Sequence, residues 1–175
     1  PNAGDDILVC NSERITVVPA DEATISSTGR RRALDAGLEI DDPESPTPMV
    51  GNLMVGNNFL VWEVDEGLCG SSSIDTLVIE YKAPAEPMDD FIEVPFQGQA
   101  TFNPLDNDDF PAGTSVEVVE EVTIGELLID AQGVFTYIAP PNFVGEVVVV
   151  YLLQSEGCTT SSATITLRIG EDAAC

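Results

Sequence analysis

Histidine is absent from the 175 residues, and Lys82 is the only lysine. Without an imidazole there is no Ser-His-Asp or Cys-His nucleophile pair and no histidine metal ligand. One lysine beside a proline-rich stretch is a poor basis for Schiff-base or phosphate-binding chemistry. Only carboxylate chemistry remains, and no spacing singles out one pair among the 31 acidic residues. We therefore expect a protein that is not an enzyme.

Positive charge is also scarce, because 6 basic residues face 31 acidic ones and the formal net charge is −25. Nucleic acids and anionic lipids are bound by Lys and Arg that neutralise phosphates, so neither is an expected partner. No apolar run approaches the roughly 18 residues of a membrane span, and direct membrane insertion is not expected. Pro1 follows no basic, apolar leader, which predicts a chain that begins after processing or inside a longer protein.

The chain nevertheless has the composition of a folded protein, with 43% hydrophobic residues and a mean hydropathy of +0.11. Apolar residues alternate with polar ones, as at Ile165, Leu167 and Ile169, which is typical of strands with one wet face. No helical periodicity of useful length occurs. The fold class predicted is all-β, with strands expected at residues 7–10, 15–18, 59–64, 77–81, 116–122, 135–138 and 147–153.

An internal repeat organises the sequence. Residues 55–62 recur as residues 144–151 at an offset of 89, which also places Cys69 on Cys158. Turn signals between short strands favour one small antiparallel sandwich per copy.

We expect domains at residues 1–86 and 87–175, joined by a short Pro-containing connector. The acidity belongs to both, because residues 1–86 carry a net charge of −11 and residues 87–175 one of −14.

The second copy carries spaced motifs of a known kind. Asn-Pro-Leu-Asp-Asn-Asp, Gly-Val-Phe-Thr-Tyr and Phe-Val-Gly occur at residues 103–108, 133–137 and 143–145. This copy resembles the tandem Ig-like, cadherin-like repeats of large secreted bacterial surface proteins. In the first copy, Pro-Asn-Ala-Gly-Asp-Asp at residues 1–6 and Gly-Leu-Cys at residues 67–69 are similar to Ig-like modules of Bacteroidota cell-surface proteins. Residues 23–49 depart from that pattern.

These resemblances imply two tandem Ig-like β-sandwiches and an extracellular or cell-surface location. They also imply a Cys10–Cys69 disulfide, because the two cysteines of such modules usually pair. Four cysteines in an acidic chain suit an oxidising compartment. Cys158 and Cys175 are left as an internal pair that needs a folded-back tail, as links between subunits, or as free thiols.

Two clusters of acidic residues follow the repeat boundary, and their candidate calcium ligands are Asp89, Asp90, Asp106, Asp108 and Asp109. Calcium takes six to eight oxygens, which Asp and Asn in a loop can supply. The same residues also build tight turns by bonding their own backbone. Calcium is therefore the possible cofactor, and solvated turns are the alternative.

Trp62 and a run of three arginines each allow more than one interpretation. Trp62 reads as a core residue rather than a sugar-stacking platform. The run of Arg30, Arg31 and Arg32 reads as a solvated loop, with a contact to an acidic neighbour or a processing site as alternatives.

The functional prediction is a structural, non-catalytic subunit or repeat of a surface fibre, filament or adhesin. It would assemble end to end through edge strands, and possible disulfides, with copies of itself or sister Ig-like domains. The N-terminal segment through Cys10 and the tail after Ile169 are the segments expected to exchange or dock. The alternative is an accessory binding or spacer module of a larger secreted protein or enzyme, with a carbohydrate or surface ligand.

Overall fold

The computed structural model describes residues 1–20, 27–65, 67, 70–119 and 122–170. These ranges contain β-strands, turns and loops and no α-helix, so the predicted all-β class is confirmed. Within them, no helix offers the length and apolar character needed to cross a membrane. The chain divides into two compact units, Pro1–Ala83 and Pro84–Cys175, a boundary three residues before the predicted one.

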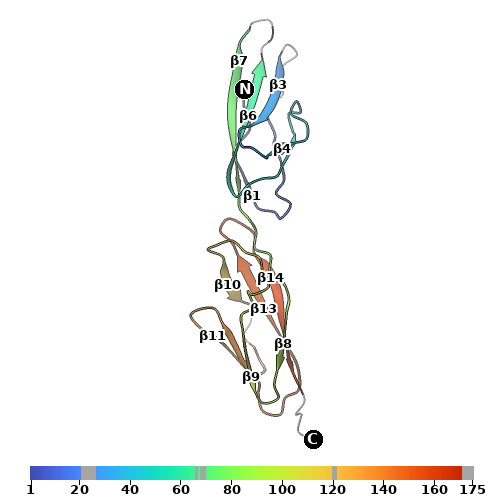
Figure 1. Cartoon of the computed structure of the whole chain (residues 1–175), viewed down its shortest axis with the longest axis vertical. Helices are drawn as coiled ribbons and strands as arrows, with labels where there is room; N and C mark the ends of the chain where they lie inside the picture. Colours follow the sequence, from blue (N-terminus) through green and yellow to red (C-terminus); the bar gives the residue numbers. More distant parts are fainter. Residues whose placement is uncertain (21–26, 66, 68–69, 120–121, 171–175) are drawn as a thin grey trace. The chain divides into compact units, whose positions relative to one another are not determined.

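The first unit is built from two sheets (Figure 1). The larger sheet has the strand order β1-β7-β6-β3, and the smaller has the order β2-β5-β4. The strands are β1 (Ile7–Val9), β2 (Thr16–Val17), β3 (Thr28–Ala33), β4 (Glu39–Ile40), β5 (Met49–Gly51), β6 (Gly56–Asp65) and β7 (Ser72–Tyr81).

The second unit repeats this plan, with a larger sheet in the order β10-β13-β14-β8 and a smaller one in the order β11-β12-β9. Its strands are β8 (Asp90–Val94), β9 (Gln99–Phe102), β10 (Ser115–Val118), β11 (Glu126–Ile129), β12 (Phe135–Ile138), β13 (Gly145–Gln154) and β14 (Ser161–Ile169). Here β13 corresponds to β6 at the offset of 89 seen in the repeat.

Both units deviate from a purely antiparallel sandwich in the same way. In each unit, the strand that comes first in the chain pairs in parallel with the strand that comes last, β1 with β7 and β8 with β14. In the first unit this pairing places Val9 beside Tyr81. The remaining strand pairs are antiparallel.

Each unit encloses its own apolar core, because alternate residues of the long strands point inward. Trp62 on β6 is 1% exposed and packs with Leu60 and Leu77, as expected of a core residue. Tyr151, its equivalent on β13, is fully buried among Phe135 and other residues of the second core.

The run of three arginines differs from its predicted loop. Residues 30–32 lie inside β3, where the strand alternation exposes Arg30 and Arg32 and buries Arg31. A protease needs an extended, accessible segment, so this paired strand is unsuitable as a processing site. The loop was predicted from charge alone, which does not reveal that one of three neighbouring cations is held inside.

The N-terminal segment is integrated into its own unit. Ala3 is fully buried, and its amide donates a hydrogen bond to Asp75 Oδ2 at 2.8 Å. Because β1 already pairs with β7, this segment is a poor candidate for exchange between chains. Of the tail after Ile169, only Gly170 lies within the described residues.

Candidate functional site

An aspartate anchors the first strand of each larger sheet. Asp89 precedes β8, and its Oδ1 accepts hydrogen bonds from the amide (2.8 Å) and the hydroxyl (2.9 Å) of Thr164 on β14. Asp6 precedes β1 in the same way, and its Oδ1 accepts the amide of Val78 on β7 at 2.8 Å. The hydrogen bonds from Thr164 lower the pKa of Asp89. Sequence reasoning placed Asp89 in an acidic cluster and missed the part that both residues take in strand pairing.

A second aspartate holds the start of β8 to the core. The Asp108 carboxylate accepts the Tyr151 hydroxyl at 2.9 and 3.0 Å and the Met88 amide at 2.7 Å. The same hydroxyl lies 3.0 Å from the Met88 carbonyl oxygen. Burial, followed by the hydrogen bond to Asp108, raises the pKa of Tyr151, which therefore acts as a neutral donor.

Asp90 is the exceptional member of this cluster. Its Oδ2 is buried and accepts no hydrogen bond from the described protein. Burial raises the pKa of Asp90 to about 6, and the negative charge of Asp108 contributes next. The cluster thus contains one carboxylate whose charged form is disfavoured.

The remaining two predicted ligands lie at the surface. Asp106 is exposed and accepts a hydrogen bond from Asn103 Nδ2 at 2.8 Å, which is the local turn bonding expected of such residues. Asp109 is exposed as well.

Across the described residues, no group of three or more His, Cys, Asp or Glu side chains is arranged to hold a metal ion. Oxygens of Asp89 and Asp108 are already bonded to protein donors. The choice between calcium ligands and solvated turns therefore stays open.

The cysteines separate into two described and two undescribed residues. Cys10 and Cys158 are each disulfide-bonded, whereas Cys69 and Cys175 lie outside the described residues. Cys10 follows Val9, which pairs with Tyr81 at one end of β7.

The predicted Cys10–Cys69 bond involves Cys69, which lies outside the described residues, so this bond stays a prediction. The pairing of Cys158 with Cys175 stays open, because Cys175 also lies outside them.

A buried arginine organises the first core. Arg31 is 1% exposed, and its Nη2 donates to the carbonyl oxygens of Ala3 and Pro19, both at 2.9 Å. Its guanidinium carbon lies 5.5 Å from the ring centroid of Trp62, within cation–π range. Desolvation lowers the pKa of Arg31. Arg31 thereby ties the N-terminal segment to the core.

Family comparison identifies the second half of the chain. Residues 82–168 match the model of the bacterial Ig domain. The second unit is a bacterial Ig domain. With the same strand order in the first unit, the chain is a tandem of Ig-like domains, as the sequence motifs implied. Domains of this fold are typically non-catalytic. Ig-like domains of this family are typical of extracellular proteins. No curated protein matches the sequence.

Two solved structures show the same tandem fold. Domains 3–5 of the extracellular part of Drosophila OTK are 10% identical with a TM-score of 0.57, over 95% of this chain and 60% of that one. The insect immune protein hemolin is 9% identical with a TM-score of 0.61, over 96% of this chain and 46% of hemolin. This chain thus spans about half the length of these structures, and at such identities the likeness is one of fold alone.

Proposed function

We propose that this tandem of Ig-like domains is a structural, non-catalytic module of an extracellular fibre or adhesin. It associates with copies of itself or with sister Ig-like domains. The observation that carries the proposal is the exposed edge of the second unit, where the short strands β10 and β11 end their sheets with apolar side chains at the surface. Unpaired strand edges of this kind accept a neighbouring chain.

Three other features support the proposal. Each unit has its own hydrophobic core, and the carboxylates of Asp89 and Asp108 hold the start of β8 in place, as expected of a mechanical unit. Disulfide-bonded Cys10 and Cys158 suit an oxidising extracellular compartment. Hemolin, whose domain arrangement has implications for homophilic adhesion, shares the fold.

Sedimentation velocity and electron microscopy of the full chain test the proposal. Concentration-dependent species larger than the monomer, and end-to-end particles on the grid, are expected. Dispersed monomers at every concentration and ionic strength would instead favour the alternative of a spacer or accessory module. Oxidised and reduced samples are compared to separate covalent from non-covalent association.

A further inference from the structure

One side of the second unit carries a groove between two edge strands. The groove has a volume of about 480 Å³, and its lining comes from the end of β10, from β11 and from the segment between them. Its lining residues are Val118, Val122, Gly125, Glu126, Leu127 and Ile129. We refer to these residues as the valine groove. Figure 1 shows β10 and β11 on the same side of the unit, each as the outermost strand of its sheet.

The apolar surface continues beyond the valine groove. A second hollow of about 240 Å³ shares Val122 and lies against Val148 and Val150 of β13. Val148 is 58% exposed and Ile129 is 50% exposed. Single exposed apolar side chains are ordinary, but a contiguous group beside hollows marks an interaction surface.

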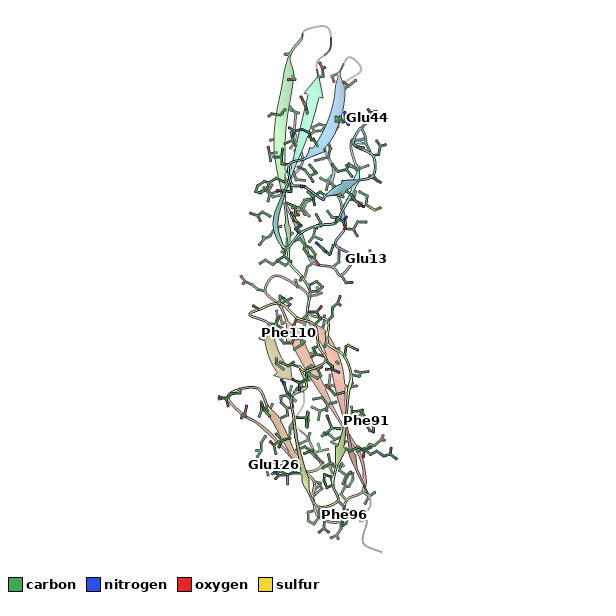
Figure 2. All side chains as sticks on the ribbon, viewed as in Figure 1. Glu13, Glu44, Phe91, Phe96, Phe110 and Glu126 are labelled. Atoms are coloured by element: carbon green, nitrogen blue, oxygen red, sulfur yellow. The ribbon has the colours of Figure 1, made fainter. Side chains whose placement is uncertain are left out.

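The rim of this surface is acidic. Glu117 on β10 and Glu126 at the start of β11 (Figure 2) are exposed. Glu146 on β13 is exposed as well, but Arg168 lies opposite it in the ladder, so it is not counted in the rim. The only basic residue in positions 87–175 is Arg168, which lies on β14 and is not part of the groove lining. A partner with an apolar side chain beside positive charges therefore complements it.

The first unit presents such a surface on β3. Arg30 and Arg32 are exposed on one face of the strand, and Leu34, two residues further on, is 51% exposed. The Leu34 amide bonds the Phe59 carbonyl at 3.0 Å, which continues the strand ladder and keeps the three side chains on one face. In the ladder, exposed Glu63 on β6 lies opposite Arg30, whereas buried Val61 lies opposite Arg32. Arg32 therefore has no acidic residue directly opposite it on this face.

We propose that the valine groove of one copy receives the Arg30–Arg32–Leu34 face of β3 from a second copy. This deepens the proposed function and rests on it. Leu34 would contact the apolar lining while the two arginines meet the acidic rim. Because the two surfaces differ and lie on different units, the contact is heterologous, and its repetition adds copies in a row.

The test is charge reversal followed by sedimentation velocity of the full chain. The double variant Arg30→Glu and Arg32→Glu is expected to weaken self-association at least about tenfold, since it turns attraction with the rim into repulsion. The double variant Glu117→Arg and Glu126→Arg should weaken it similarly. Both pairs of side chains are exposed, and Trp62 fluorescence checks that the first unit remains folded.

Mixing the two double variants should restore association, because the reversed strand face then meets the reversed rim. Arg168→Glu is the matched control, since it reverses an exposed arginine outside the groove. It should change the dissociation constant less than about twofold.

If both double variants associate as strongly as the wild-type protein, this interface is overturned and the proposed function is left intact. Failure of the mixture to recover would also overturn it. Monomeric wild-type protein at all concentrations would refute the proposed function and this inference together.

Discussion

Replacing Asp90 with Asn should make the second unit more stable at neutral pH. The pKa of Asp90 is raised from 3.8 to about 6, so the folded protein holds this proton more tightly than the unfolded chain does. The stability that this proton contributes is fully present below the pKa of Asp90 in the unfolded chain. It is lost as the pH rises through the pKa of Asp90 in the folded protein. Asn keeps the shape of the side chain without the charge.

The magnitude follows from the shift and the surroundings of the side chain. The full shift corresponds to about 3 kcal/mol at 1.36 kcal/mol per unit. Asp90 is only partly buried, and solvent screening reduces the expected effect to about 1 kcal/mol. The stability difference between Asp90→Asn and wild type should therefore grow by about that amount between pH 4 and pH 7.

Differential scanning calorimetry of the full chain at pH 4, 5, 6, 7 and 8 measures this difference. Trp62 is the only tryptophan and lies in the first unit, so its fluorescence assigns one transition and leaves the other to the second unit. At pH 7 the second transition should rise by about 4 °C. Exposed Asp109 supplies the control, because Asp109→Asn removes the same charge from the surface of the same unit and should have little effect on stability at any pH. An equal effect of both variants, or a pH-independent effect of Asp90→Asn, would refute the reasoning.

Three further outcomes are expected. Tyr151→Phe removes the hydroxyl that Asp108 accepts and should destabilise the second unit by about 2 kcal/mol, measured by calorimetry; a loss below about 0.5 kcal/mol would contradict that hydrogen bond's role. Peptide mapping without reduction should find Cys10 and Cys158 in disulfide-linked peptides, and labelling of either one as a free thiol would contradict the structure. Calcium or a chelator should leave the melting temperature unchanged within about 1 °C, because carboxylate oxygens of the cluster already bind protein donors; a larger rise with calcium would revive the metal site.

The cluster around Asp90 shows where prediction from local pattern stops. The sequence places acidic residues before β8 and in the loop at residues 106–109, which is compatible with ion ligands or with turns. Its chemistry depends on Tyr151, more than 40 residues away, and on Thr164 across the sheet. Local reasoning has no access to such pairs, because parallel pairing of β8 with β14 creates the contact with Thr164, and packing of the loop at residues 106–109 on β13 creates the contact with Tyr151.

The sequence by itself determined the all-β class, the tandem repeat and the buried position of Trp62, because alternation and spacing are written locally along the chain. Only the tertiary structure decided which of the three arginines is buried, where Cys10 lies relative to the end of β7, and which aspartates join strands. The physical reason is strand register. Two strands that pair in parallel are linked through contacts between residues far apart in the sequence, and a shift by one position would turn each side chain to the opposite face.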